Sequence, residues 1–398
     1  MAGLHTARLL RGHGFGGRVT LVGSEDCPPY DRPPLSKGVL AGTVGSVGEL
    51  AFPVDLAVLD VDVRYGERGV SWSPGTVTLS SGAAVAYDAL VLATGSEPMR
   101  IGAPDHDSVH TLRSYGDALR LRKQLKPGAE ITIVGAGWIG AEVATAARAA
   151  GCDVVVVEAQ PWPLAAMFPE VIGSAIADWY AAAGVDLELR SQVASLHGLD
   201  DGRIRILLDD GECSETDTLL VAVGARPDVR WLGDAFDYAA DGALLVDEHL
   251  ATSVPGVFAV GDCAAYNSLR YGRHIRVEHW DNALRGPETV ATNVLGGTAV
   301  HDPVPYFWSE QFGRMVQYIG RHSGADQLVL RGDLTEASWS AVWLDASAQV
   351  TAVLAVGKPR DLAQGRKLIT ASAVLDEAKV ADTSLSLSLS APLSAATS

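Results

Sequence analysis

The sequence predicts an α/β protein with two related domains, each a three-layer arrangement of a parallel sheet and a β-meander, followed by a small C-terminal α+β domain. Each half of the chain contains a glycine turn, a helix and a strand that ends in an acidic residue. Each half then contains short strands separated by turns and closes on the pattern D-x-L-(L/V)-(L/V)-A-x-G-x-x-P, at 88–98 and 217–227. From about Pro303 the pattern changes to short strands with aromatic residues, which predicts the third domain.

The first half begins inside its glycine turn. Gly3 reads as the last glycine of that turn, residues 4–10 as the helix after it, and 18–23 as a strand closed by Glu25. We expect about ten residues, the preceding strand and the first two glycines, to be absent from this sequence. Because that strand normally lies at the centre of its sheet, its absence would weaken both core packing and nucleotide binding.

The second half contains the complete motif. An apolar strand leads into GAGWIG (135–140), and the next strand ends at Glu158. Gly135 permits the tight turn, Gly137 lets the backbone approach a pyrophosphate, and Gly140 allows close helix–strand packing. The pyrophosphate would lie at the helix N-terminus; a purely structural turn is the alternative. Because Glu158 can accept both ribose hydroxyls and repels a 2′-phosphate, we expect NADH rather than NADPH.

Three further polar features could belong to a second nucleotide site. Glu25 would hold its ribose, unless it is only a solvated acid after a strand. Four prolines give PPYDRPPLSK (28–37) a defined shape, so Arg32 and Lys37 could neutralise a phosphate or a reduced flavin. A solvated basic loop is the alternative there. Asp262 follows an apolar strand and a glycine, where it could accept a hydrogen bond from a ligand hydroxyl or cap the next helix.

Composition excludes several classes of protein. The 398 residues are 47% hydrophobic, but no run approaches the roughly 18 to 20 apolar residues of a spanning helix. The net charge of −17 disfavours nucleic acid and anionic membranes as partners. The cysteines form no CxxC or CxxxxC pair and no metal-ligand cluster, so we expect no metal site. Without a secretion signal, a reducing cytoplasmic location is expected.

Seven motifs, in this order and over nearly the whole chain, resemble one family. The chain resembles the FAD-dependent, NADH-linked ferredoxin reductases of the putidaredoxin reductase and biphenyl-dioxygenase ferredoxin reductase type. The motifs are PPYDRPPLSK (28–37), LVLATGSEP (90–98), GAGWIGAE (135–142), VAVGARPD (221–228), GVFAVGDCA (256–264), EHWDNA (278–283) and FWSEQF (307–312).

The resemblance implies two Rossmann-like domains, two cofactors and a set of site residues. FAD would be bound by Gly3, Glu25, Arg32, Lys37, Val70, Ala93, Thr94, Gly95, Arg113, Asp262 and Trp280. NADH would be bound by Gly135, Gly137, Ile139, Gly140, Glu142, Glu158 and Gly224. Lys37, Glu142 and Trp280 would act in catalysis, with Glu142 near the nicotinamide and Trp280 beside the isoalloxazine ring. Trp308 would approach the flavin from the far side.

The same resemblance implies domain boundaries. It places an FAD-binding domain at 1–102 and 227–302, an NAD-binding domain at 103–226 and a C-terminal dimerisation or interface domain at 303–381. Residues 382–398, with the repeat SLSLSLS, would form a loose, low-complexity tail. The protein would be a monomer or a homodimer.

The implied reaction carries electrons from NADH through FAD to an iron–sulfur ferredoxin that feeds a cytochrome P450 or a Rieske oxygenase. A rubredoxin or monodehydroascorbate reductase is the alternative in the same class, and a flavin-poor, non-catalytic protein is the alternative outside it. The chain departs from the family at Trp162 and Ala166, where arginines are usual. This loss of cations further disfavours NADPH.

The ferredoxin partner poses an electrostatic problem, because ferredoxins are mostly acidic and so is this chain. Docking would therefore need a local basic patch. Arg270, Arg273, Arg276 and Arg285, near Trp280 in the sequence, are the candidates, and a solvated basic hairpin is the alternative.

Overall fold

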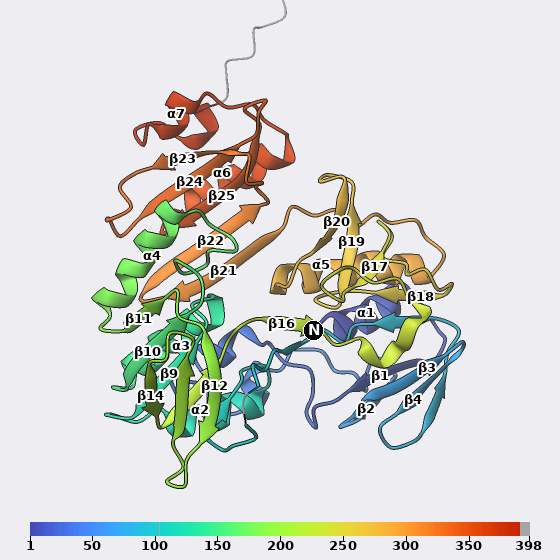
Figure 1. Ribbon diagram of the computed structural model, residues 1–398. Coiled ribbons are helices and arrows are strands. Elements are labelled where there is room, and N and C mark those ends of the chain that lie inside the picture. Colours follow the sequence, from blue (N-terminus) through green and yellow to red (C-terminus); the bar gives the residue numbers. More distant parts are fainter. Residues whose placement is uncertain (103, 391–398) are drawn as a thin grey trace, which may run out of the picture. The chain divides into compact units, whose positions relative to one another are not determined.

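The computed structural model describes residues 1–102 and 104–390 (Figure 1). The chain divides into two compact units, each built from segments that are distant in sequence. Unit 1 comprises Met1–Met99, Arg113–Leu119 and Gly224–Pro303, and unit 2 comprises Arg100–Leu112, Arg120–Val223 and the chain from Val304 onward. Among the described residues, no helix is both long and apolar enough to cross a membrane.

Unit 1 contains the elements expected of the first half. Helix α1 (Ala2–Gly12) packs against α5 (Trp280–Val294), and buries Leu4, Ala7 and Leu10, which share one helical face. Strand β1 (Val19–Gly23) pairs in parallel with β2 (Val61–Tyr65). Strand β6 (Leu90–Leu92) pairs in parallel with β18 (Val257–Ala259), in a separate sheet.

The repeated pattern at 88–98 and 217–227 ends in two strands that pair with each other. Strand β7 (Ser96–Pro98) is antiparallel to β16 (Ala225–Pro227). The second half of the chain therefore returns to unit 1 at the point where the first half leaves it.

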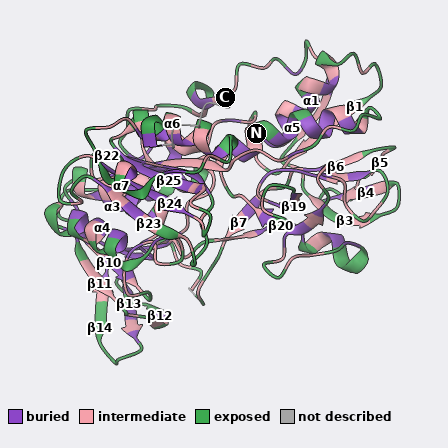
Figure 2. Ribbon diagram, turned by 90° about the horizontal axis from the view of Figure 1, so that it is seen from above, coloured by how far each residue is buried: buried purple, intermediate pink, exposed green. Residues whose placement is uncertain are grey.

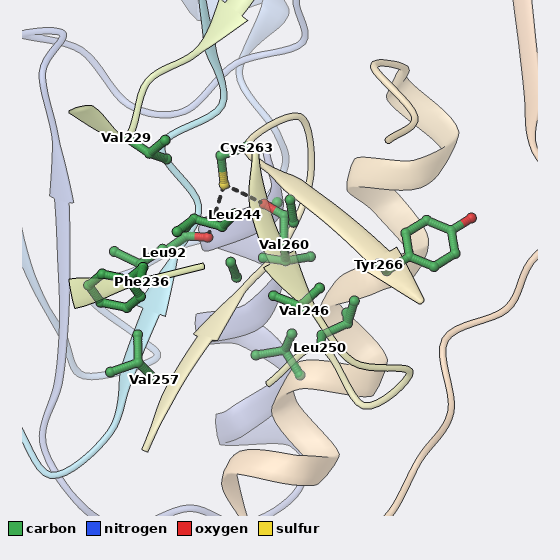
Figure 3. Packing of buried hydrophobic residues seen from close by; sticks show 14 of the residues in the cluster. Leu92, Val229, Phe236, Leu244, Val246, Leu250, Val257, Val260, Cys263 and Tyr266 are labelled. Carbon is green, nitrogen blue, oxygen red and sulfur yellow. Dashed lines mark hydrogen bonds between the residues drawn. The ribbon is translucent and has the colours of Figure 1, made fainter. Parts of the chain in front are cut away.

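The core of unit 1 lies between these strands and the sheet of β17 (Leu244–Val246), β19 (Ala264–Ser268) and β20 (Arg273–Arg276). Figure 3 shows Leu92, Phe236, Leu244 and Val257 among the residues packed in this core. The Cys263 thiol is fully buried and donates to the carbonyls of Leu92 and Val260, at 3.3 and 3.4 Å, so it behaves as a small core residue (Figure 3).

Both predicted β-meanders are present. The first consists of β3 (Gly69–Ser73), β4 (Thr76–Leu79) and β5 (Ala84–Ala86), and the second of β12 (Val193–Gly198), β13 (Ile204–Leu208) and β14 (Cys213–Thr216). The turns between strands place Gly75, Gly82, Gly202 and Gly211 at positive φ, which explains why glycine occurs there.

Unit 2 contains a five-stranded parallel sheet. Its order is β11-β10-β9-β15-β8, formed by Asp186–Leu189, Asp153–Glu158, Glu130–Val134, Thr218–Val221 and Val109–His110. The connecting helices include α3 (Trp138–Ala149) and α4 (Glu170–Ala182). Helix α2 (Tyr115–Gln124) begins in unit 1 and ends in unit 2.

The C-terminal part of unit 2 is an antiparallel sheet with helices, as predicted. The sheet order is β21-β22-β25-β24-β23, formed by Tyr306–Gln311, Arg314–Gly320, Val350–Val356, Trp339–Leu344 and Gln327–Arg331. Every residue of β24 is buried, and Figure 2 shows purple along this strand. Helix α6 (Pro359–Thr370) packs on β22 and β25, and α7 (Glu377–Ala381) follows it. The predicted fold class is confirmed.

The prediction of a loose tail from residue 382 is wrong for its first part. Leu387 is fully buried in the core of the C-terminal sheet. The buried guanidinium of Arg331 donates to the carbonyls of Asp382 and Leu385, at 3.0 and 2.9 Å, which fixes the backbone of this segment. The remainder of the predicted tail, 391–398, lies outside the described residues.

Candidate functional site

The glycine turn between β9 and α3 is built as predicted. Gly135 has φ 108°, and a Cβ there would lie 2.5 Å from the Ala222 carbonyl oxygen. A Cβ on Gly140 would lie 2.0 Å from the Gly135 oxygen. The protein's own backbone therefore requires both glycines. Gly137 differs, because its φ is −81° and a Cβ there would meet no atom within 4 Å. The open space at Gly137 leaves room for a ligand.

The N-terminus of α3 is suited to an anion. This helix has no side-chain cap and no acidic residue in its first turn. Five other α-helices among the described residues, α2, α4, α5, α6 and α7, each have an acidic residue there. Unsatisfied N–H groups and the helix dipole favour negative charge, and a first-turn acid would compete for it. The N-terminus of α3 thus leaves this position to a phosphate.

Glu158 lies at the end of β10, beside the glycine turn. Its Oε2 accepts from the Ala136 amide at 2.7 Å, and its Oε1 accepts from the Gln160 amide at 2.8 Å. The segment that follows, 159–169, contains no lysine, arginine or histidine. A carboxylate without a neighbouring cation in that segment suits ribose hydroxyls and disfavours a 2′-phosphate.

Trp162, one of the two departures from the family, has a structural explanation. Its indole Nε1 donates to the Phe168 carbonyl at 2.9 Å. A Cβ on Gly173 would lie 2.0 Å from Trp162 Cδ1, so the indole packs directly against the α4 backbone. Trp162 therefore holds the segment after Glu158 in place. Nothing in the structure explains Ala166, which is exposed.

The other predicted NADH residues divide into exposed and buried positions. Ile139 is 40% exposed in the first turn of α3. Glu142 is 6% exposed and accepts from the Ser309 hydroxyl of β21 at 2.6 Å. Gly224 has φ 103°, a backbone conformation that favours glycine, and its carbonyl accepts from the Met99 amide at 3.0 Å.

In unit 1, Glu25 is the centre of a hydrogen-bonded group. Arg32 donates to its Oε1 at 2.7 Å and Tyr30 donates to its Oε2 at 2.5 Å. The Tyr30 hydroxyl also accepts from the Tyr115 amide at 2.8 Å. Burial raises the pKa of Tyr30, so its hydroxyl stays a donor. Glu25 and Arg32 are therefore partly exposed, at 29% and 40% of their side chains, but each has hydrogen-bond partners.

A second group surrounds Asp262. Arg113 and Ser96 both donate to its Oδ2, at 3.0 and 3.2 Å. Asp117 in turn accepts from the Arg113 amide at 3.1 Å, which fixes the backbone of that arginine. The helix-cap alternative for Asp262 is wrong, because the strand β19 follows it.

The two groups are joined within unit 1, because Arg32 also donates to the Arg113 carbonyl. Gly95 lies beside them with φ 73°, and a Cβ there would lie 3.0 Å from Arg113 Nη2. A Cβ on Gly3 would lie 3.5 Å from that of Ala93, which places α1 against the LVLATG segment that contains Thr94.

Trp280 and Lys37 both contact the proline-rich loop. The Trp280 indole donates to Asp31 Oδ1 at 2.7 Å. Burial raises the pKa of Asp31, and the hydrogen bond from Trp280 partly offsets it. Lys37 Nζ lies 3.3 Å from the Pro33 carbonyl. Asp31 thus orients the Trp280 indole, and the Pro33 carbonyl lies beside the Lys37 ammonium.

Val70 lies in the sheet of β3, β4 and β5. It is 47% exposed in β3. The backbone that lies beside Glu25 instead comes from Gly66 and Glu67, whose amides donate to the carbonyls of Glu25 and Gly23 at 3.1 and 3.0 Å. The contact of Val70 with FAD stays a prediction. Sequence reasoning also missed Asp31, Ser96 and Ser309, whose partners are far away along the chain. It missed Tyr30 as well, which joins the nearby Glu25 to the distant Tyr115.

Of the four candidate docking arginines, Arg276 is not suited to the role. Its side chain is 10% exposed, and it donates to the Asp262 carbonyl at 2.7 Å and pairs with Asp241 at 3.2 Å. Arg270 and Arg273 are exposed on the β19–β20 hairpin. Arg285 pairs with Asp281 at 2.7 Å and is 45% exposed.

Comparison with known families identifies the chain. Residues 1–286 match the pyridine nucleotide-disulphide oxidoreductase family, and residues 306–391 match the reductase C-terminal family. The chain belongs to the pyridine nucleotide-disulphide oxidoreductase family. The resemblance drawn from the seven motifs is therefore confirmed.

Its relatives within this family are reductase components. The chain is 36% identical to the chlorobenzene dioxygenase ferredoxin reductase component of Cupriavidus sp. (strain PS12), over 97% of this chain and 94% of that protein. It is 34% identical to the benzene 1,2-dioxygenase system ferredoxin–NAD(+) reductase subunit of Pseudomonas putida, over 96% and 94%.

Solved structures of this family have the same fold. The ferredoxin reductase for the CYP199A2 system from Rhodopseudomonas palustris matches with a TM-score of 0.91 and 32% identity, over 98% of this chain and 97% of that one. Putidaredoxin reductase, in its covalent complex with putidaredoxin, matches with a TM-score of 0.92 and 28% identity, over 97% and 94%.

Proposed function

We propose that this protein is an FAD-dependent ferredoxin–NAD(+) reductase. It carries electrons from NADH through FAD to a [2Fe–2S] ferredoxin, which feeds a cytochrome P450 or a Rieske oxygenase. The observation that carries the proposal is the match over almost the entire chain with ferredoxin reductase components of oxygenase systems. The glycine turn at 135–140 with Glu158 in unit 2 suits one dinucleotide, and Gly3 with Glu25 in unit 1 suits the second. Because NADH is a cytoplasmic reductant, we place the protein in the cytoplasm.

In this proposal, residues 1–102 and 227–302 form the domain that binds FAD, and residues 103–226 form the domain that binds NADH. Residues 303–381 then form the interface domain. FAD held in the first of these domains would supply the conversion of a two-electron hydride from NADH into single electrons for an iron–sulfur cluster. The division of the chain into two units, each with one of the two carboxylates Glu25 and Glu158, supports this assignment.

The residues of unit 1 supply binding and charge. Glu25, held by Arg32 and Tyr30, is oriented to accept from the adenosine ribose. Asp262, fixed by Arg113, accepts from the ribityl and pyrophosphate region. The ammonium of Lys37 would stabilise the negative charge of a reduced flavin, and the Trp280 indole, oriented by its bond to Asp31, would pack beside the flavin ring.

The residues of unit 2 bind NADH and reject NADPH. The free N-terminus of α3 and the open space at Gly137 suit the pyrophosphate, and Glu158 suits the ribose. Ile139 would border the nucleotide, and Glu142 lies farther along α3. Gly224, which belongs to unit 1, remains a predicted NADH contact.

The proposal is tested with three electron acceptors. Purified protein is given NADH and a [2Fe–2S] ferredoxin, a rubredoxin or monodehydroascorbate, and the kcat/KM of each acceptor is measured. We expect the ferredoxin to be reduced most efficiently. Faster reduction of rubredoxin or monodehydroascorbate would transfer the proposal to that substrate, and colourless protein that stays colourless with added FAD would refute an enzyme altogether.

Docking is assigned to Arg270 and Arg273, with Arg285 as a further contact. Because the chain is acidic, an exposed basic hairpin gives an acidic ferredoxin a local point of attraction. The double variant Arg270→Glu, Arg273→Glu should raise the ferredoxin KM about tenfold or more, and leave NADH–ferricyanide turnover unchanged. Arg360→Glu with Arg366→Glu, on α6, makes the same charge change in unit 2 and serves as the control. Equal loss of both activities would refute the docking site.

A further inference from the structure

Strand β21 runs along one face of α3 within unit 2. Three contacts join α3 to β21 and to Phe312, the residue that follows this strand, and their α3 residues are spaced four and three apart, so they share one helical face. The contacts are Trp138 with Phe307, whose ring centroids are 4.6 Å apart, Ser309 donating to Glu142 at 2.6 Å, and the Phe312 amide donating to Thr145 Oγ1 at 2.9 Å.

The middle contact differs from the other two, because it involves a buried carboxylate. Glu142 is 6% exposed and Ser309 is 1% exposed. Gln311, fully buried, donates from its Nε2 to the Ser309 oxygen at 3.2 Å. Since this bond uses the hydroxyl oxygen as an acceptor, the hydroxyl proton is left to point at Glu142. The order Gln311, Ser309, Glu142 is thus a directed chain of hydrogen bonds that fixes one orientation of the carboxylate.

Glu142 lies where a fixed charge would affect nicotinamide chemistry. It follows Gly137 by five residues, which is about 7 Å along the helix axis from the N-terminus of α3. That distance is within reach of the nicotinamide half of a dinucleotide whose pyrophosphate lies at this N-terminus. Nicotinamide becomes positive when it gives up a hydride, and a nearby fixed carboxylate stabilises that charge.

We propose that Ser309, oriented by Gln311, is a positioning residue that fixes the Glu142 carboxylate for the nicotinamide end of NADH. The C-terminal sheet then sets the electrostatics of the NADH site through β21, besides packing against it. This inference rests on the proposed function, since it requires that the dinucleotide lie on α3.

A purely structural role for Ser309 is the competing explanation, and Thr145 provides the matched control. Ser309 and Thr145 each supply one hydroxyl that joins β21 to α3. Thr145→Val removes the Thr145 hydroxyl with little change of volume, and Glu142 keeps its hydrogen bond from Ser309. Ser309→Ala removes the hydroxyl that contacts the carboxylate. If the role is structural, the two variants should behave alike.

The experiment measures binding of NAD+ and of ADP-ribose, which lacks nicotinamide, by calorimetry on the FAD-loaded protein. We expect Ser309→Ala to weaken NAD+ binding about tenfold and to leave ADP-ribose within about twofold, because one charge-assisted hydrogen bond is lost at the nicotinamide end. Ser309→Thr should restore NAD+ binding. Thr145→Val should lower the melting temperature while changing neither affinity.

A double-mutant cycle covers the case in which Ser309→Ala folds poorly. Glu142→Gln should weaken NAD+ and spare ADP-ribose, and Ser309→Ala should add nothing further in that background. Equal effects of Ser309→Ala on both ligands, or the same effects from Thr145→Val, would overturn the inference and leave the proposed function standing. Wild-type protein that binds neither ligand would overturn the proposed function and the inference together.

Discussion

Replacing Gly137 with alanine separates what the dinucleotide requires from what the fold requires. The backbone at Gly137, with φ −81° and ψ −169°, is extended and accessible to alanine. A Cβ there meets no protein atom within 4 Å. The cost to the fold is then the loss of glycine as an N-cap, about 0.5 to 1 kcal/mol, or a melting temperature lower by about 2 °C.

The cost to binding should be much larger. The added methyl group occupies the space through which a pyrophosphate would approach the backbone, and overpacking of this kind costs about 1 to 3 kcal/mol. This corresponds to an increase of about 5- to 150-fold in the Kd for NAD+. Calorimetry with NAD+ and thermal unfolding of the same FAD-loaded sample measure the two costs separately.

Gly140→Ala is the contrasting variant. Helix propensity alone would make it stabilising by about 1 kcal/mol. The structure predicts the opposite, because the new Cβ would lie 2.0 Å from the Gly135 oxygen and the turn must move. Gly140→Ala should therefore lower both the melting temperature and NAD+ affinity. The reasoning is refuted if Gly137→Ala unfolds as early as Gly140→Ala, or if its Kd for NAD+ stays within about twofold of wild type.

Three further predictions concern single polar residues. Glu158→Gln keeps an oxygen that accepts from the Ala136 amide but loses the negative charge. The kcat/KM should therefore fall about tenfold for NADH and rise for NADPH. An unchanged ratio of the two kcat/KM values would contradict the role of Glu158 in binding the ribose. Tyr30→Phe removes a donor to Glu25 and the acceptor of the Tyr115 amide. The free energy of unfolding should therefore fall by about 1 to 3 kcal/mol, and the protein should lose more FAD on dialysis than wild type does. Full retention of FAD would contradict this. Burial lowers the pKa of His301 from 6.5 to about 4. Because the unfolded chain then binds more protons below pH 6.5, urea unfolding should show stability falling by about 2 kcal/mol from pH 7 to pH 5, and less in His301→Gln.

Features of the fold and of the site that depend on residues close together in the sequence could be predicted from the sequence. The glycine turn at 135–140 and the acid that closes β10 are local patterns, and both lie where they were expected. The β-meanders were predictable because their turns need glycine at positive φ. Each of these features is determined by a short stretch of chain.

Contacts between distant segments could not be predicted in the same way. Trp280 and Asp31 are 249 residues apart, and Ser309 and Glu142 are 167 apart. Such pairs depend on how the elements pack, which no local pattern encodes. Arg276 was misjudged for the same reason, because its charge is satisfied by Asp241 from another segment. The first part of the tail, from residue 382, was misjudged because its backbone carbonyls accept hydrogen bonds from Arg331, which is distant in the sequence.

The central claim is that this chain binds FAD and NADH and passes electrons between them. The most direct test is an anaerobic titration of the FAD-loaded protein with NADH and, separately, with NADPH, followed by the visible absorbance of the flavin. We expect complete bleaching by a stoichiometric amount of NADH and little change with NADPH. A flavin spectrum that NADH leaves unchanged would contradict it.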